Sequence, residues 1–201
     1  MINPSGGTAI APTIGATLNG HQTVQFSRGS QEYLVPTTPL SPNPLAPETG
    51  GSPLQQKSFW YVFNWTADVS ANGPTAGYDN SALFCDLQNR INIAFRSGKS
   101  QVCIFDNAFK GTEVAYTNST WAIGMVLIDG VNVSIRIGNG VFTSTACGFL
   151  ASSGGAVQIG RSSDNVALFG GRIASFGMAD SLWDAPTCAA IYARLASDWG
   201  L

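Results

Sequence analysis

The segment from Trp121 to Ile137 constrains the fold of this chain most strongly. Two apolar runs are separated by Asp129-Gly130, and Asp-Gly between two such runs is the strongest local signal for a two-residue hairpin turn. This turn predicts an antiparallel pair in which Ile128 lies opposite Val131, and Val126 lies opposite Val133. One face of the pair is then apolar on both strands, and we expect it to lie in a core. Its residues are Ala122, Gly124, Val126, Ile128, Val131, Val133, Ile135 and Ile137.

The reverse face of the same hairpin is apolar on the first strand and polar on the second. An apolar strand face is rarely left open to water, so another element or a partner must cover it. The apolar side consists of Trp121, Ile123, Met125 and Leu127, and the polar side consists of Asn132, Ser134 and Arg136.

A helix that could provide this cover is predicted near the C-terminus. Asp184 is a suitable N-cap, a proline follows in the first turn, and Gly200 is a suitable stop. Between them, apolar residues recur at helical spacing and form one stripe, which must dock on the sheet or on a neighbouring molecule. The stripe consists of Cys188, Ile191, Tyr192, Leu195 and Trp199.

Two further strands, near 156–160 and 171–178, are predicted between the hairpin and the helix. The order of hairpin, Gly138-Asn139-Gly140, Val157–Gly160, Gly170–Phe176, Ser181-Leu-Trp and short helix resembles the second half of a concanavalin A-like or laminin-G-like jelly roll. The resemblance implies an all-β sandwich with one short C-terminal α-helix. Such domains serve as lectins, glycanases, adhesion modules and bacteriophage structural proteins, so the fold does not choose the function.

The N-terminal half is less regular. We expect residues 1–20 to be an extended arm or an irregular first edge strand, and 21–201 to be a single jelly-roll domain. Thr23–Phe26 and Gln31–Val35 are predicted short strands. The Pro-rich segment 36–53 is predicted to be a long loop that is either a mobile linker or held against a partner.

The chain carries few charges. Only 11% of its residues are charged, against about 25% in typical soluble domains. The ten basic residues are scattered without a run, which argues against binding to nucleic acid or to anionic membranes. A weakly charged surface resists aggregation poorly, so we expect a homo-oligomer or larger assembly. The first residues contain neither a basic segment nor an apolar signal core, and we therefore expect assembly in a host cytoplasm.

The four cysteines, Cys85, Cys103, Cys147 and Cys188, lack metal-binding spacing, and His21 is the single histidine. A predicted meander would place Cys85 and Cys103 two strands apart, roughly 9–10 Å, which is beyond disulfide reach. A disulfide stays open as an alternative, but four reduced thiols are favoured. The meander comprises Ala82–Leu87, Arg90–Arg96 and Ser100–Phe105.

Aromatic residues indicate where a ligand could bind. The run 57–66 places Phe59, Tyr61, Phe63 and Trp65 on one strand face, and Trp60, Val62 and Asn64 on the other. Such a stripe either stacks sugars on a concave face or belongs to a central strand buried on both faces, and the second is the commoner arrangement. The aromatic residues predicted to contact a ligand or partner are Trp65, Tyr78, Trp121 and Trp183.

No catalytic or metal-binding pattern stands out, so we expect a non-enzymatic protein without a cofactor. The Glu-x-Asp-x-x-Glu pattern of jelly-roll glucanases is absent. The closest acidic pair, Asp180 and Asp184, precedes the helix, where capping explains it. The remaining turn aspartates show no calcium-ligand spacing. They are Asp68, Asp79, Asp106, Asp129 and Asp164.

Two functional hypotheses follow. The first is a virion structural protein, either a capsid decoration or cement subunit or a tail-associated subunit of a bacteriophage, whose partners are other capsid or tail proteins. Low charge and the open apolar face at Trp121 motivate it. The second is a lectin-like, carbohydrate-binding adhesion module that recognises a cell-surface glycan through aromatic side chains.

Overall fold

A computed structural model describes residues 11–27, 32–34, 56–66, 81–86, 91–96, 99–105, 109–146, 157–161 and 169–201. The strands are β1 Thr13–Leu18, β2 His21–Phe26, β3 Lys57–Trp65, β4 Ser81–Asp86, β5 Ile91–Arg96, β6 Lys99–Phe105, β7 Phe109–Ala115, β8 Trp121–Ile128, β9 Asn132–Ile137, β10 Thr143–Ala146, β11 Val157–Ile159 and β12 Gly171–Ala179, and the helix is α1 Ala185–Trp199.

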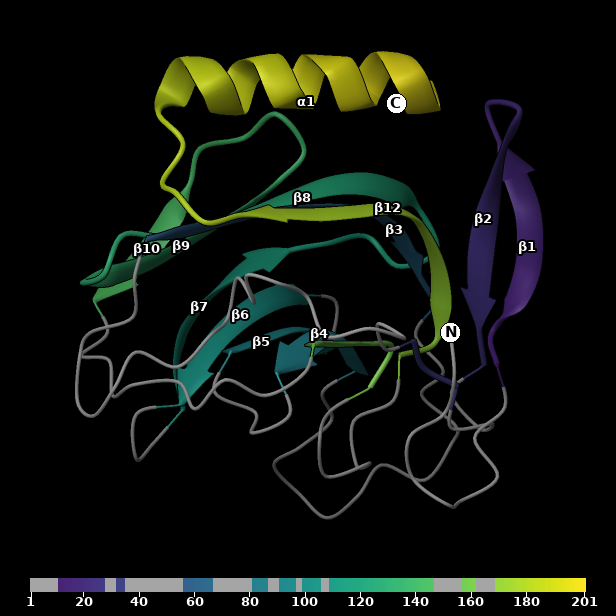
Figure 1. The fold of residues 1–201 in the computed structure, drawn as a ribbon, viewed down its shortest axis with the longest axis horizontal. Coiled ribbons are helices and arrows are strands. Elements are labelled where there is room, and N and C mark those ends of the chain that lie inside the picture. Colours follow the sequence, from purple (N-terminus) through teal and green to yellow (C-terminus); the bar gives the residue numbers. More distant parts are fainter. Residues whose placement is uncertain are drawn as a thin grey trace.

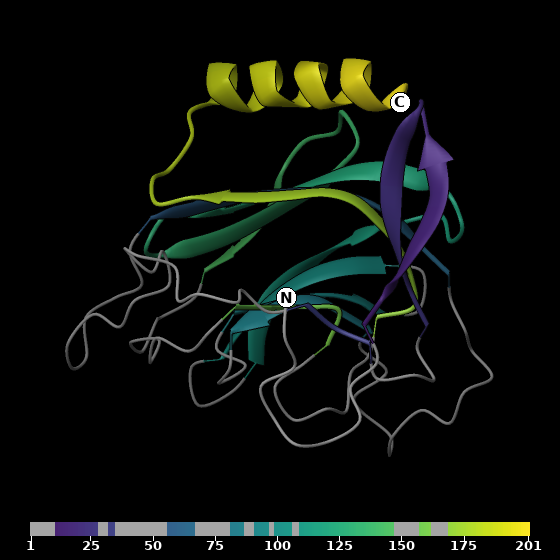
Figure 2. The same cartoon turned by 45° about the vertical axis from the view of Figure 1, so that its right-hand side comes forward.

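The strands form two antiparallel sheets that pack face to face, with α1 lying across the outer side of the larger one (Figures 1 and 2). The seven-stranded sheet has the order β1-β2-β12-β3-β8-β9-β10, and the five-stranded sheet has the order β11-β4-β5-β6-β7. The predicted β-sandwich with one C-terminal helix is therefore confirmed.

The register of the β8–β9 hairpin differs from the prediction by two residues. Ile128 pairs with Val133 rather than Val131, and Val126 pairs with Ile135. Because the shift is an even number of residues, the other predicted core positions keep their face. Val131 does not, since it lies at the hairpin tip and is 64% exposed.

The turn explains the shift. The backbone N–H of Asp129 donates to the carbonyl of Asn132 at 3.1 Å. The Asp129 carboxylate accepts from the N–H groups of Val131 and Asn132 at 2.8 and 2.6 Å. Asp129 therefore pairs with Asn132 instead of lying in the loop. The loop consists of Gly130, with φ of 93°, and Val131.

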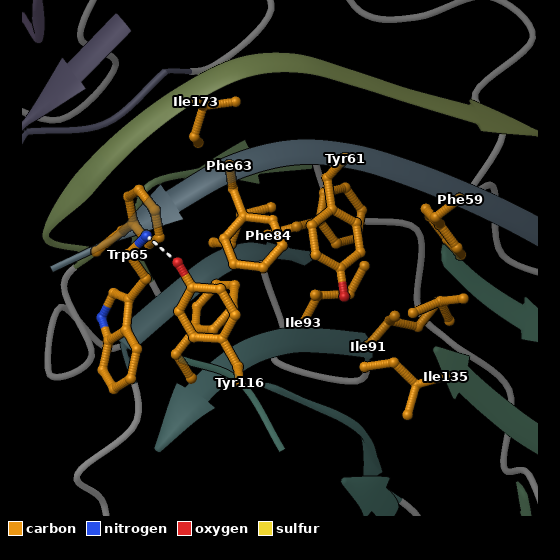
Figure 3. Close-up of a cluster of buried hydrophobic side chains, with 14 of the residues drawn as sticks. Phe59, Tyr61, Phe63, Trp65, Phe84, Ile91, Ile93, Tyr116, Ile135 and Ile173 are labelled. Carbon is orange, nitrogen blue, oxygen red and sulfur yellow. Dashed lines mark hydrogen bonds between the residues drawn. The ribbon is translucent and has the colours of Figure 1, made fainter. Parts of the chain in front are cut away.

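The core lies between the sheets and is centred on β3, as Figure 3 shows. Phe59, Tyr61, Phe63 and Trp65 all point into it and are buried, which confirms the interpretation of 57–66 as a buried central strand. The backbone N–H of Trp65 donates to the Tyr116 hydroxyl at 3.0 Å, and burial raises the pKa of that hydroxyl. A buried polar group at the core edge is thus paired, as stability requires.

Helix α1 has the predicted caps. The Asp184 side chain accepts from the N–H of Thr187 at 2.9 Å, and Gly200 ends the helix in the left-handed conformation with φ of 67°. The stripe of α1 packs on the outer face of β8 and β3, where Leu195 joins Val62 and Ile123 in a second buried cluster. Of the two predicted docking sites for the stripe, the sheet is therefore the one that the structure shows.

At the N-terminal side, β1 and β2 form a hairpin around Asn19-Gly20, and β1 is the edge strand of the larger sheet. Of the predicted arm 1–20, residues 13–18 are thus an edge strand, while residues 1–10 lie outside the described residues. Of the predicted strand Gln31–Val35, residues 32–34 are described, and they contain an isolated bridge between Leu34 and Ile159. The Pro-rich segment 36–53 also lies outside the described residues.

The predicted meander is confirmed as β4-β5-β6. Cys85 pairs with Asn92, and Asn92 pairs with Cys103, so the two cysteines stand two strands apart, as the sequence predicts. Cys188 is a buried free thiol on α1.

Candidate functional site: a polar row beside the C-terminal helix

The outer face of the seven-stranded sheet is organised in rows across the strands. Residues directly opposite each other in paired strands point to the same side of a sheet. The outward residues of β3 are Ser58, Trp60, Val62 and Asn64, and each belongs to a different row. From Trp60 onward, the chemistry of the face changes along β3 from aromatic through aliphatic to polar.

The first row lies at the start of α1. The Trp60 ring lies over Gly177, where an added Cβ would stand 1.9 Å from the ring, and Trp183 covers Trp60 with 5.5 Å between ring centroids. The hydroxyl of Ser58 accepts from the backbone N–H of Trp183 at 3.1 Å. This packing makes Trp183 part of the connection that anchors the helix.

The same row ends in a buried cation. The Arg136 guanidinium donates to the Cys188 carbonyl at 3.1 Å and lies 4.8 Å from the centre of the Phe142 ring and 5.6 Å from that of Tyr192. A buried charge needs such partners, and Arg136 therefore fastens the first turns of α1 to β9.

The third row is polar and is the candidate site. Gln25 on β2, Arg172 on β12, Asn64 on β3 and Trp121 on β8 follow one another across four adjacent strands. We refer to these four residues as the polar row. Gln25, Arg172 and Trp121 are half-buried, whereas Asn64 is buried. The row therefore combines one aromatic surface, one cation and two amides.

Arg172 spans the row. Its guanidinium lies 5.1 Å from the centre of the Trp121 ring, although Asn64 separates the two residues in the register. Its stem passes Gly15 on the edge strand, where an added Cβ would stand 3.4 Å from the Arg172 Cδ. The outer part of the Arg172 side chain thus lies between the edge strand and the Trp121 ring.

Gln25 is fixed by the backbone. Its Nε2 donates to the carbonyls of Phe26 and Gly171 at 3.1 and 3.0 Å. Both amide hydrogens are thereby used, so the amide presents its oxygen as the group for a further partner. A rigid acceptor thus stands next to a rigid cation.

The turn of the β1–β2 hairpin and the C-terminal end of α1 lie close together (Figures 1 and 2). The Asn19 side chain donates to the Asp198 carbonyl at 2.9 Å, and the His21 ring lies 5.1 Å from that of Trp199. Trp121 and Trp199 both pack against the second buried cluster. The β1–β2 hairpin and the end of α1, which lie near opposite ends of the described chain, are therefore in contact.

The predicted contact residues end up in different places. Trp65 is 4% exposed and belongs to the core, so its ring is not presented to a ligand. Trp183 lies at the start of α1, and Trp121 lies in the polar row. Tyr78 lies outside the described residues.

Sequence reasoning did not single out Gln25 or Arg172 as site residues, and it placed Asn64 only on a strand face. The available signal was the presence of polar residues within otherwise apolar strands. Their meeting depends on β12 inserting between β2 and β3, which no local pattern indicates.

Comparisons with solved structures identify the architecture. The chain is similar to the botulinum neurotoxin serotype G binding domain, with a TM-score of 0.65 at 12% identity, over 92% of this chain and 45% of that one. It is equally similar to the binding domain of Paraclostridial Mosquitocidal Protein 1, with a TM-score of 0.65 at 11% identity, over 94% of this chain and 48% of that one.

A third solved structure carries a sugar. It is the botulinum neurotoxin serotype D ligand binding domain in complex with N-acetylneuraminic acid, with a TM-score of 0.58 at 12% identity, over 76% of this chain and 41% of that one. The chain spans less than half the length of all three. At these identities the likeness shows a shared β-sandwich. No protein-family model and no curated protein sequence matches the chain.

The described part of the chain contains no group of three or more His, Cys, Asp or Glu side chains that could hold a metal ion. Its helix is not long and apolar enough to span a bilayer.

Proposed function

We propose that this chain is a non-enzymatic glycan-binding module and that the polar row is its binding site. The observation that carries the proposal is the cation–π contact of Arg172 with the half-buried Trp121, next to the fixed Gln25 amide. An aromatic ring with a few convergent polar groups suits the alternating apolar and hydroxyl surfaces of a sugar. The sugar bound to the serotype D domain supports the same class of ligand.

Binding would use groups that are already in place. The sugar's apolar C–H surface would lie against the exposed edge of Trp121, and its hydroxyls would donate to the Gln25 oxygen. Because the Gln25 amide is held by two backbone carbonyls and the Arg172 guanidinium lies over the Trp121 ring, little side-chain entropy is lost on binding.

A glycan array with the intact chain tests the proposal. We expect retention of a subset of glycans, and loss of that retention in Trp121→Ala and in Gln25→Leu. Trp183→Ala is the matched control, since it removes a half-buried tryptophan on the same side of the sheet but at the other end of α1. Each variant is first checked for an unchanged far-UV spectrum and a cooperative melt.

Gln25→Leu keeps the test decisive if Trp121→Ala does not fold. If the folded wild-type chain retains no glycan, or if Gln25→Leu retains glycans as the wild type does, the proposed site is wrong.

A structural role in a particle is the second candidate, and the β1–β2 hairpin favours it. Residues 13–26 contain no Asp, Glu, Lys or Arg, β1 is an edge strand, and Ile14 on it is 73% exposed. An uncharged edge strand lacks one of the usual protections against pairing with another chain. We propose on this basis that, if the chain is a bacteriophage capsid or tail subunit, β1 is where copies or neighbours join.

Light scattering coupled to size exclusion tests this second candidate. The wild-type chain should form oligomers that Ile14→Lys converts to monomers, whereas Val141→Lys, at a loop residue that is 87% exposed, should leave them intact. A wild-type chain that stays monomeric at high concentration would contradict it.

A further inference from the structure

We infer that the polar row selects an acidic sugar, and that Arg172 binds its carboxylate. This inference rests on the proposed function and concerns the same site. It goes beyond glycan binding as such because it assigns the ligand's charge and the residue that recognises it.

The first argument is the charge of the row. Arg172 is its one ionisable member, and Gln25, Asn64 and Trp121 are neutral. The ion pairs among the described residues are Lys57–Asp180 and Arg194–Asp198, so no carboxylate from the described part of the chain neutralises Arg172. The site presents a positive charge to whatever enters it.

The second argument is the geometry of the contact between Arg172 and Trp121. A guanidinium is planar, and its five N–H donors lie in that plane. The Arg172 central carbon lies over the Trp121 ring, 5.1 Å from the ring centre, within the range of a cation–π contact. This contact is not a hydrogen bond, and the N–H donors of the guanidinium are the groups that bind a carboxylate through two parallel hydrogen bonds.

The third argument is preorganisation. Gly15 leaves room for the Arg172 stem, and a Cβ at this position would also approach the Thr23 hydroxyl to 2.7 Å. The Gln25 oxygen, one strand away, can accept from a ring hydroxyl while the carboxylate lies on Arg172. The Arg172 cation and the Gln25 oxygen thus suit the carboxylate and a hydroxyl group that an acidic sugar carries on one ring.

The test compares three soluble probes on the intact chain by titration calorimetry: lactose, sialyllactose and sulfated lactose. We expect sialyllactose to bind at least about ten-fold more tightly than lactose, equivalent to about 1.4 kcal/mol. In Arg172→Gln the preference of sialyllactose over lactose should fall to within about two-fold. Arg172→Lys should restore only part of it, because an ammonium group cannot form the bidentate pair.

Arg194→Gln is the matched control, since it removes the same charge from an exposed position on α1, and its preference should equal that of the wild type. Equal affinity of the wild type for lactose and sialyllactose would overturn the inference while leaving glycan binding intact. Retention of the preference in Arg172→Gln, or equal binding of sulfated lactose, would also overturn the assignment to a carboxylate on Arg172. A chain that binds no glycan on the array or in the calorimeter fails the proposed function itself.

Discussion

Gly124 on β8 lies directly opposite Tyr61 on β3, and the Tyr61 ring fills the space that a side chain at 124 would need. A Cβ atom on Gly124 would stand 2.2 Å from the Tyr61 Cζ. The large ring can occupy the core only because its strand partner has no side chain, so the two positions are coupled.

Gly124→Ala should therefore destabilise the fold by about 1–3 kcal/mol through overpacking, measured by urea denaturation. Gly140→Ala is the control, because the nearest atom to its added Cβ is 3.6 Å away, and we expect no comparable loss. The double variant Gly124→Ala, Tyr61→Leu should lose less than the sum of the two single variants. Additive losses would contradict the coupling.

Leu195 tests the docking of α1. It is 8% exposed and packs against Val62 and Ile123, so Leu195→Ala should cost about 2–5 kcal/mol of unfolding free energy. The exposed Ala193 offers a control, since Ala193→Ser should change the same free energy by less than about 0.5 kcal/mol. An unchanged denaturation midpoint for Leu195→Ala would mean that the helix contributes little to stability.

The Asp184 cap predicts a contribution of α1 that depends on pH. The side-chain and backbone hydrogen bonds from Thr187 hold the pKa of the Asp184 carboxyl below its usual value. A lowered folded pKa means that the stabilisation is present above the unfolded pKa, which is about 3.9, and is lost as the pH falls through the folded pKa. The helix N-terminus should thus weaken only in acid.

Hydrogen exchange of the first turn of α1, compared between neutral pH and about pH 3, measures this effect. Asp184→Asn is the matched variant, because Asn also caps helices but does not titrate. Protection of the first turn should fall on acidification more in the wild type than in Asp184→Asn. Equal falls would show that the cap does not titrate as expected.

Cys188 reports on the opening of the helix. It is 2% exposed, and burial raises the pKa of its thiol, opposed in part by the nearby Arg136 charge. Since the thiolate is the reactive form, alkylation of the folded chain at about pH 8 should be much slower at Cys188 than after unfolding in urea. Peptide mass spectrometry follows the modification of this residue separately from the other cysteines.

Leu195→Ala should accelerate alkylation of Cys188 in the absence of denaturant. Both are buried residues of α1, so weaker docking of the helix should expose the Cys188 thiol more often. Labelling of the wild type at the rate of the unfolded chain would show that the helix is not docked in solution.

The sequence predicted those parts of the fold whose signals are local. The Asp184 and Gly200 caps, the apolar stripe of α1 and the two-sided apolar character of β3 are all properties of short segments. The hairpin at Asp129-Gly130 was also found, but its register was wrong, because the Asp129 carboxylate binds two backbone N–H groups and moves the loop by one residue. Turn chemistry of this kind is decided by competing hydrogen bonds that spacing alone does not reveal.

The candidate site was predictable only in part. Trp121 was singled out because it is an aromatic residue on an apolar strand face that needs a cover. Its partner Arg172 is far away in the sequence, on β12, and reaches Trp121 across β3. Pairing between strands so distant in sequence depends on the topology of the whole sheet, as does the burial of Trp65.

The place of β12 in the larger sheet has a consequence for biosynthesis. β12 joins the pair β1–β2 to the group β3-β8-β9-β10, although all of those strands are made before it. On the ribosome, the two parts have no common neighbour until β12, which begins at Gly171, has emerged, and Gln25 and Asn64 stay unconnected until Arg172 lies between them. We therefore expect this sheet to be completed late in its synthesis, and a nascent chain arrested before residue 171 would expose two unpaired strand edges to chaperones.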